Sequence, residues 1–333
     1  MKAEERISAF VKLGDTLSNL DSDTKEGIIR MAQQQNAWFT PENTERAIEG
    51  IAHILEEEKL QEWLKKYSLE CEMPKIVGIV MAGNIPLVGF HDLLCVLLSG
   101  HFAAIKTSKD DTLLVKWLVD LLLDIEPKFK KSLEQRDRLT DIDAVIATGS
   151  DNTARYFQSY FGHLPHIIRK NRSSIAVLTG KESAAELSEL GKDIFWYFGL
   201  GCRNVSKLLV PKDYKPDFLF ESIQHLEPII HHHKYRNNYD YNKSIYLVNS
   251  EPHLDTGFLL WRKSTDLVSP ISVVYAQEYE SKDEVNAYIE SHKEKIQCVV
   301  GAGFIPFGKA QLPEPWDYAD NVDTLAFLVG LKD

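Results

Sequence analysis

From residue 74 onward, short runs rich in β-branched residues alternate with amphipathic segments that are long enough to form helices. The runs KIVGIVMA, FAAIK and DAVIAT predict strands, and the segments between them, PLVGFHDLLCVLLSG and DTLLVKWLVDLLLDI, predict helices. This alternation is typical of βαβ units, in which helices cover both faces of a parallel sheet. The sequence therefore predicts an α/β protein.

The same alternation resumes in the second half of the chain. Strands are expected at SSIAVLTG, VSKLLVP, SIYLVN, SPISVVYA and IQCVVGAG, and helices at residues 182–198 and at KDEVNAYIESH. The first 70 residues predict helices, with the clearest start at Thr40 as cap and Pro41 in the first turn. We therefore expect an N-terminal helical segment at 1–73, α/β domains at 74–170 and 171–312, and a tail at 313–333.

Composition limits the functions that such a chain can perform. A formal net charge of −11 argues against nucleic-acid binding, because phosphates require a basic surface. No apolar run reaches the roughly 18 residues that a membrane span requires. The N-terminus, MKAEERISAFVKLGD, carries charges of both signs and lacks the apolar stretch of a signal peptide. We expect a cytoplasmic protein with no stable membrane insertion.

The cysteines and histidines indicate neither a disulfide framework nor a metal site. The four cysteines are far apart, without a CxxC pair or a zinc-like spacing to histidine, so reduced thiols are expected. Three consecutive histidines, His231 to His233, point in different directions on a helix or a strand, and a solvated turn is expected there. The basic cluster Arg169, Lys170 and Arg172 is expected to be solvated or to meet a phosphate.

Three small polar loops, GNIP, KTS and TGS, follow the first three expected strands. Open parallel sheets bind ligands at the carboxyl ends of their strands, so these loops are candidate binding elements. In the first loop, Asn84 could donate a hydrogen bond to a developing oxyanion, or it could cap a helix at 86–99 that has Pro86 in its first turn. Both roles are open at this level.

The second and third loops carry candidate phosphate ligands. Lys106 ends its strand, where an ammonium group could reach ribose hydroxyls or phosphate, although lysine is more often a solvated surface residue. Gly149 and Ser150 open a helix, which is a weak phosphate-binding signal. Neither GxGxxG nor GxxxxGK[ST] occurs in the chain.

One cysteine, Cys202, lies among small residues in YFGLGCRNVSK, after an expected helix and before an expected strand. Gly199 and Gly201 would permit a tight turn and the close approach of a ligand. A thiol reacts as its thiolate, which needs a lowered pKa, and free cysteines are commonly buried apolar fillers. Local pattern alone favours the filler over the nucleophile, and favours it more firmly for Cys71, Cys95 and Cys298.

Taken in order, these stretches resemble the aldehyde dehydrogenase superfamily, and most closely the acyl-CoA reductases related to the LuxC fatty-acid reductase of bacterial bioluminescence. The resemblance covers residues 74–312. It rests on AGNIPLVGFHDLLCVLLSGHFAAIKTSKDD, on the Gly-Ser turn ATGSDNTARY and on YFGLGCRNVSKLLVP, which resembles the catalytic cysteine loop of the family. TDLVSPISVVY resembles the acidic-x-x-Gly-Pro stretch, with Asp266 and Ser269 in place of glutamate and glycine.

The resemblance implies an aldehyde-dehydrogenase-like fold of two α/β domains, with nicotinamide cofactor bound at 74–170 and catalysis at 171–312. Cys202 would be the nucleophile, and Asn84 would hold the oxyanion together with the Cys202 backbone N–H. The implied cofactor is NADPH, with NADH as the alternative. The implied cofactor contacts are Lys106, Thr107, Ser108, Gly149, Ser150 and Asp266.

Hydrolytic aldehyde dehydrogenases carry a general-base glutamate before the cysteine, and counting back about 34 residues from Cys202 reaches Ile168 instead. Without that base, a thioacyl-enzyme is better suited to thiol exchange or hydride delivery than to hydrolysis. The resemblance thus implies reduction of an acyl-CoA thioester to the aldehyde, in fatty acid metabolism.

Two other outcomes stay open from the sequence. One is a different reaction of the same site: reduction of an acyl-carrier-protein or acyl-adenylate donor, with an acyl-transferring protein as partner, or aldehyde oxidation. The other is a non-catalytic member that acts as a binding subunit. The oligomeric state is open as well, homo-oligomers included.

Overall fold

The computed structural model describes residues 1–331, which form two compact units. The first comprises Met1–Asn171 together with the chain from Pro313 onward, and the second comprises Arg172–Leu312. Both combine a largely parallel sheet with helices, so the predicted α/β class is confirmed. No helix among the described residues is long and apolar enough to cross a membrane.

The sheet of the first unit has five parallel strands in the order β3-β2-β1-β4-β5. Strands β1, β2 and β4 are the three expected from the sequence, and their central residues are buried. The sequence did not predict the edge strands β3 and β5, which are short. The strands span Ile76–Val80 (β1), Phe102–Lys106 (β2), Leu133–Gln135 (β3), Ala144–Thr148 (β4) and His166–Arg169 (β5).

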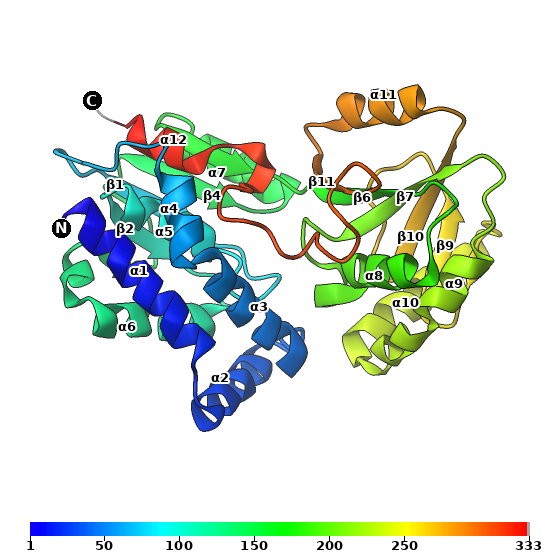
Figure 1. Ribbon diagram of the computed structural model, residues 1–333, viewed down its shortest axis with the longest axis horizontal. Helices are drawn as coiled ribbons and strands as arrows, with labels where there is room; N and C mark the ends of the chain where they lie inside the picture. The colour runs from blue at the N-terminus through cyan, green and yellow to red at the C-terminus, as the bar shows by residue number, and fades with distance from the viewer. Residues whose placement is uncertain (332–333) are drawn as a thin grey trace. The chain divides into compact units, whose positions relative to one another are not determined.

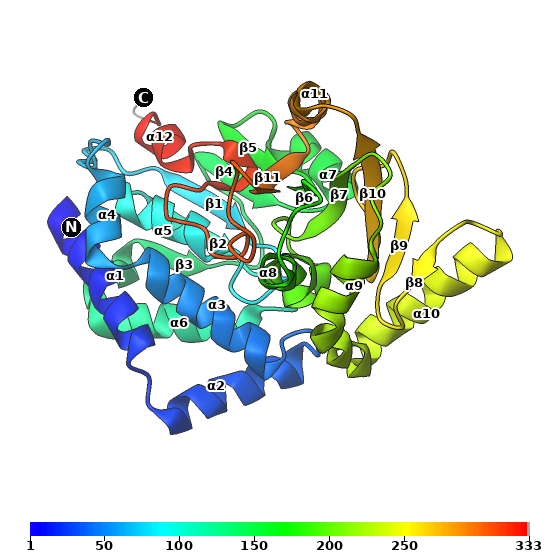
Figure 2. The same ribbon diagram turned by 45° about the vertical axis from the view of Figure 1, so that its right-hand side comes forward.

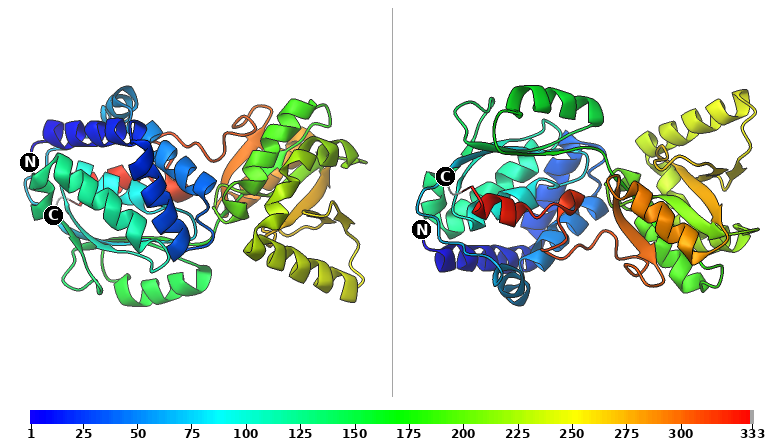
Figure 3. Two further views of the ribbon diagram at one scale, coloured as in Figure 1. Left: turned by 90° about the horizontal axis from the view of Figure 1, so that it is seen from below. Right: turned by 90° about the horizontal axis from the view of Figure 1, so that it is seen from above.

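Helices cover both faces of this sheet. Helices α5 (Phe90–Leu98) and α6 (Thr112–Ile125) connect β1, β2 and β3 on one face, and α7 (Asp151–Phe161) lies against β4 and β5 on the other (Figure 3). Helix α5 is buried along almost its whole length. It begins at Phe90 rather than at Pro86 as expected, because Leu87 has a φ of 57° and interrupts the helical path.

The N-terminal helices and the tail share the core of the first unit (Figure 1). The four helices are α1 (Ala3–Ser18), α2 (Ser22–Gln35), α3 (Pro41–Ile54) and α4 (Glu57–Leu64), followed at the far end of the chain by α12 (Thr324–Val329). Helix α3 starts as expected, with the Thr40 side chain accepting from the Asn43 N–H.

Segments 1–73 and 313–331 are therefore not separate units. Trp63 of α4 donates a 2.8 Å hydrogen bond to the Tyr318 hydroxyl, which ties the tail to the N-terminal helices. Residues 332 and 333, the end of the expected tail, lie outside the described residues.

The sheet of the second unit has six strands in the order β11-β6-β7-β10-β9-β8. All neighbouring pairs are parallel except β8 and β9, which are antiparallel. The strands span Ser173–Val177 (β6), Val205–Pro211 (β7), Leu254–Asp255 (β8), Leu260–Lys263 (β9), Val273–Tyr279 (β10) and Ile296–Gly301 (β11).

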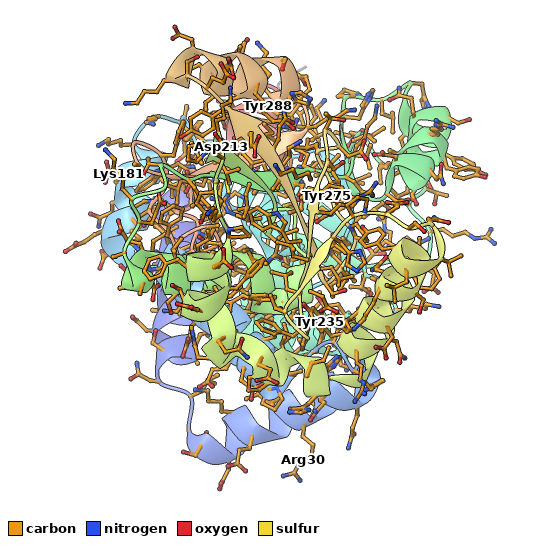
Figure 4. The ribbon with its side chains drawn as sticks, turned by 90° about the vertical axis from the view of Figure 1, so that its right-hand side faces the viewer. Arg30, Lys181, Asp213, Tyr235, Tyr275 and Tyr288 are labelled. Atoms are coloured by element: carbon orange, nitrogen blue, oxygen red, sulfur yellow. The ribbon has the colours of Figure 1, made fainter. Side chains whose placement is uncertain are left out.

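Helix α11 (Lys282–His292) covers one face of this sheet, and α8 (Ala184–Phe195), α9 (Asp217–Ile223) and α10 (His233–Val248) cover the other. Figure 4 shows the arrangement through three tyrosines: Tyr288 of α11 and Tyr235 of α10 lie on opposite sides of β10, which carries Tyr275. Helix α10 packs along β9 and β10 (Figure 2).

Two sequence expectations in this unit are wrong. SIYLVN is the last part of helix α10 and not a strand, because Tyr239, Asn242 and Tyr246 are buried at helical spacing along it. The three histidines lie where two helices meet and not in a simple turn, although His231 and His233 are exposed as expected. His231 ends a 3₁₀ helix (Gln224–His231), and His232 caps α10 by accepting from the Tyr235 N–H.

Candidate active site

The carboxyl edge of the first sheet collects the three loops expected from the sequence. From β1 the chain proceeds through β2 and β3 to one side, and β4 and β5 then lie on the other side of β1. The loops that follow β1 and β4 therefore diverge, which is the point where open α/β sheets bind ligands. Asn84 and Gly149 lie on these two loops.

The loop after β1 is locked to the loop after β2. A Cβ atom on Gly83 would lie 2.7 Å from the Ser108 side chain, so this contact requires glycine. The Leu87 N–H donates a 2.7 Å hydrogen bond to Asp111 Oδ2. Asp111 is only 1% exposed, and this burial raises the pKa of its carboxyl to about 8, against the opposing effect of the Leu87 amide. Sequence reasoning missed Asp111.

Asn84 is exposed in this loop and does not cap helix α5, whose N-cap position is held by Gly89. The capping alternative for Asn84 is wrong, because the helix starts six residues further along the chain. The Asn84 side chain thus lies at the carboxyl edge of the sheet and does not cap helix α5.

The predicted cofactor residues after β2 differ in their surroundings. Lys106 is exposed at the end of its strand. The Thr107 hydroxyl accepts a 3.1 Å bond from Gln135 Nε2, and the Ser108 carbonyl accepts from the Thr112 hydroxyl at 2.8 Å. The loop is thereby fixed by its own hydrogen bonds, while the lysine ammonium is left toward solvent.

The loop after β4 ends in a helix N-terminus, as the sequence predicted. Ser150 is the N-cap of α7, and its hydroxyl accepts from the Thr153 N–H at 3.3 Å. A Cβ on Gly149 would come within 3.0 Å of Thr153 and Phe157. Helix N-termini favour anions, because their first N–H groups have no partner within the helix.

Arg169 does not belong to a solvated basic cluster. Its guanidinium donates to Asp92 of α5 at 2.5 Å and to the Thr324 hydroxyl of the tail at 2.8 Å, and the residue is only 3% exposed. Arg172 instead donates to the carbonyls of Lys293 and Ile296 in the second unit. Ile168 precedes Arg169 in β5, so an apolar strand residue stands at the position of the missing general base.

The second unit presents Cys202 on a strained turn between α8 and β7, which we call the cysteine turn (residues 196–204). Tyr197, Phe198 and Gly199 have φ angles of 52°, 57° and 77°, in the left-handed region that disfavours side chains. Cys202 itself is half-buried. Its carbonyl accepts a 3.1 Å hydrogen bond from the Ser174 hydroxyl of β6.

Asn204 fastens this turn from within. Its side-chain amide donates to the carbonyls of Asp193 at 3.1 Å and Trp196 at 2.8 Å, and its Oδ1 accepts from the Gly201 N–H at 2.8 Å. Asn204 is buried. No local sequence pattern marks this role, because asparagine is common in any turn.

The other three cysteines differ from Cys202 in their surroundings. Cys95 is fully buried in α5, and burial raises the pKa of its thiol. Cys298 lies in β11 with its sulfur 3.0 Å from the Ser174 hydroxyl, and Cys71 is half-buried in the first unit. Within residues 1–331, no three His, Cys, Asp or Glu side chains are grouped so that they could hold a metal ion.

The predicted cofactor contact Asp266 is exposed on the loop after β9, where it accepts from the Ser264 hydroxyl at 3.2 Å. A residue missed by sequence reasoning holds this loop: Lys207 of β7 donates to the carbonyls of Ser264 and Asp266 at 3.1 and 3.0 Å. It also donates to Gln277 Oε1 at 2.7 Å. Lys207 is completely buried, and burial lowers the pKa of its ammonium to about 8.

The fold matches that of aldehyde dehydrogenases. An aldehyde dehydrogenase of Mycobacterium tuberculosis complexed with NAD+ has a TM-score of 0.63 at 13% identity, over 86% of this chain and 71% of its own. The indole-3-acetaldehyde dehydrogenase AldA of P. syringae gives 0.66 at 13% identity, over 90% and 72%. The aldehyde dehydrogenase KauB of Pseudomonas aeruginosa gives 0.65 at 13%, over 90% and 72%.

The sequence identifies the family within that fold. The sequence model of the acyl-CoA reductase (LuxC) family matches residues 15–218, more than half of the 333 residues. The chain therefore belongs to the LuxC acyl-CoA reductase family, as predicted, and it has the predicted aldehyde-dehydrogenase-like fold. The match includes Asn84, Lys106 and Cys202 but ends before Asp266. A comparison with curated proteins gave no significant match.

Proposed function

We propose that the protein reduces an acyl-CoA thioester to the aldehyde, using NADPH and a thioacyl-enzyme on Cys202. Membership in the LuxC family supports an oxidoreductase that acts on acyl groups. The observation that carries the finer proposal is the cysteine turn: within the family match, Cys202 is half-buried on a turn in which Tyr197 and Phe198 both have a left-handed backbone. Such strain is retained where surrounding structure enforces it, and it is frequent at active sites.

The carboxyl edge of the first sheet suits a dinucleotide. Gly83 and Gly149 allow the loops at this edge to pack closely, because a Cβ on either residue would crowd neighbouring side chains. The N-terminus of α7 can receive a pyrophosphate, with Gly149 and Ser150 beside it. Lys106 ends β2, and Thr107 and Ser108 follow it. In this position an acidic residue would favour the ribose hydroxyls of NADH, whereas the exposed lysine supports binding of the 2′-phosphate of NADPH.

In the proposed first step, the Cys202 thiolate attacks the thioester carbonyl and forms a carbon–sulfur bond. Asn84 and the Cys202 N–H stabilise the oxyanion, and the bond to CoA then breaks to release the CoA thiolate. Asn84 belongs to the first unit and Cys202 to the second, so their joint action is part of the proposal.

In the second step, the thioacyl carbon is reduced. When bound, the reduced nicotinamide supplies the hydride that this carbon accepts. The same two groups stabilise the second oxyanion, and Cys202 leaves as thiolate when the aldehyde forms. Ile168 has no titratable group that could activate water as a general base. This supports release of the aldehyde over hydrolysis of the thioacyl-enzyme to the acid.

The test is NADPH oxidation by the purified protein with acyl-CoA donors from short to long chains. We expect donor-dependent oxidation in the wild type, loss of more than about 1,000-fold in Cys202→Ala, and near-normal rates in the control Cys71→Ala. Lys106→Ala should weaken NADPH binding more than NADH binding. Absence of NADPH oxidation with every acyl-CoA would refute the proposal. If oxidation then occurred with an acyl-carrier-protein or acyl-adenylate donor, that donor would replace acyl-CoA as the substrate. Absence of oxidation with all of these donors would favour a non-catalytic subunit.

A further inference from the structure

The side chain of Asn204 uses all of its hydrogen-bonding groups on the segment that surrounds Cys202. Its amide donates to carbonyls at the end of α8, those of Asp193, Ile194 and Trp196, at 3.1, 3.4 and 2.8 Å. Its Oδ1 accepts from Gly201, the residue directly before the nucleophile. One side chain thus joins the two ends of the strained turn.

The backbone of Asn204 is fixed just as firmly. Its N–H donates to the Gly201 carbonyl at 3.0 Å, and its carbonyl accepts from the Ser174 N–H of β6 at 3.1 Å. The neighbouring Cys202 carbonyl accepts from the Ser174 hydroxyl. The backbone of Asn204 therefore attaches the turn to the sheet. The Asn204 side chain in turn binds Gly201 and the end of α8, so both are held in place relative to the sheet.

We propose that Asn204 is a positioning residue for Cys202. The last carbonyls of a helix have no partners within the helix, and Tyr197 and Phe198 resist the left-handed backbone that the turn requires. The Asn204 amide satisfies those carbonyls and stabilises that backbone. Through its bond to the Gly201 N–H, it fixes the direction in which the Cys202 thiol and the Cys202 N–H point. This inference rests on the proposed nucleophilic role of Cys202.

Loss of a residue that orients Cys202 should affect two reactions of the thiol, acyl transfer and alkylation, to different extents. Acyl transfer needs the sulfur and the oxyanion donor aligned on one carbonyl carbon, and a misplacement of about 1 Å can cost roughly 100-fold in rate. Alkylation by a small reagent needs only an accessible thiolate. Loss of Asn204 should therefore reduce acylation of Cys202 far more than its alkylation.

The experiment compares Asn204→Ala with a matched control, Asn242→Ala, in the full-length chain. Asn242 is also a buried asparagine of the second unit, and its amide donates to a backbone carbonyl, that of Ile271, at 3.0 Å. Acylation is followed by the nitrophenolate burst from p-nitrophenyl acetate and by CoA release from an acyl-CoA. Alkylation by iodoacetamide is followed at Cys202 by peptide mass spectrometry, with Cys71 as the internal reference.

We expect Asn204→Ala to lower both acylation rates by about 100-fold per folded molecule, with Cys202 alkylation within about threefold of wild type. Asn242→Ala should lose stability, but its acylation rates should not fall more than its Cys202 alkylation rate. Equal losses of acylation and alkylation, or unchanged acylation per folded molecule, would overturn the positioning role. A wild-type burst from p-nitrophenyl acetate without CoA release from any acyl-CoA would refute the proposed donor and leave the comparison of the two asparagine variants valid.

A second variant, Asn204→Asp, gives an independent readout. It keeps an acceptor for Gly201 but can donate to the carbonyls only while its carboxyl is protonated, and burial beside carbonyl oxygens would raise the pKa of that carboxyl. At each pH, the acylation rate of Asn204→Asp is divided by that of Asn204→Ala. We expect this ratio to increase as pH falls, toward the ratio found for wild type. Identical pH profiles of the two variants would contradict a role for the amide donors.

Discussion

The carboxyl group of Asp111 accepts a hydrogen bond of 2.7 Å from the backbone N–H of Leu87, a residue with a left-handed φ of 57°. This bond joins the loop after β1, which carries Asn84, to the start of α6, directly after the predicted cofactor residues. No side chain would fit between Gly83 and Ser108, so the two loops pack closely against each other. A change in either loop should therefore be felt by the other.

Removal of the Asp111 acceptor should disturb both loops. Asp111→Ala leaves the Leu87 N–H without its partner in a buried place, which costs about 1–3 kcal/mol of unfolding free energy. We expect weaker NADPH binding as well, since the Lys106 loop loses its support. Asp111→Asn keeps an acceptor and should bind NADPH almost as wild type. Urea denaturation and fluorescence titration measure the two effects, and equal behaviour of the two variants would contradict this account.

The same carboxyl makes stability depend on pH. Its pKa is raised from 3.8 to about 8 by burial, so the folded state holds a proton that the unfolded chain releases near pH 4. The stability it contributes is fully present below the unfolded pKa and is lost as pH rises through about 8. Asp111→Asn should remove this loss, so the difference in melting temperature between variant and wild type should increase from pH 5 to pH 9. The exposed neighbour variant Asp110→Asn should show no such trend.

Lys207 should act on the cofactor through the Asp266 loop. Lys207→Met preserves bulk but removes three hydrogen bonds and leaves the carbonyls of Ser264 and Asp266 without this donor. We expect a loss of about 1–3 kcal/mol in stability and a higher KM for NADPH with a smaller change in kcat. Asp266→Ala should share the KM effect without the loss of stability. A KM unchanged in Lys207→Met would show that this loop does not contribute to cofactor binding.

Removal of either partner of the buried pair Arg169–Asp92 should strongly destabilise the first unit. Removing one partner leaves an uncompensated buried charge, which typically costs about 3–5 kcal/mol. Arg169→Met alone should therefore destabilise strongly, and the double variant Arg169→Met with Asp92→Leu should recover much of the loss. Urea unfolding of the single and double variants measures this coupling, and additive losses would mean that the two residues act independently.

Much of the fold could be predicted from local pattern. The period of apolar residues predicted β1, β2, β4, β6, β7, β10 and β11 and the helices α5, α6, α8 and α11, because buried strands and amphipathic helices have distinct repeats. SIYLVN was misassigned for a tertiary reason: its tyrosine and isoleucine residues suit a strand locally, but packing of Tyr239 and Tyr246 against β9 and β10 selects the helix.

The candidate site was predicted unevenly. Glycines, a cysteine between them and a lysine at a strand end are visible as residue types, and together with the resemblance they led to the prediction of Cys202, Asn84 and Lys106 as site residues. Asp111, Asn204 and Lys207 were missed. Each acts through hydrogen bonds to backbone groups of other segments, such as Leu87, Trp196 and Ser264, and no local pattern marks such a bond.

The sequence by itself determined the α/β class, the family and the residue types that could perform chemistry, because these depend on periodicity and on short motifs. The tertiary structure alone decided that Asn84 is not a helix cap, that Arg169 is buried against Asp92, and that Asn204 holds the cysteine turn by hydrogen bonds. Those outcomes depend on contacts between residues that are distant in the chain or held by a strained backbone. Only the folded chain brings such partners within hydrogen-bond distance and excludes the water that would otherwise compete for them.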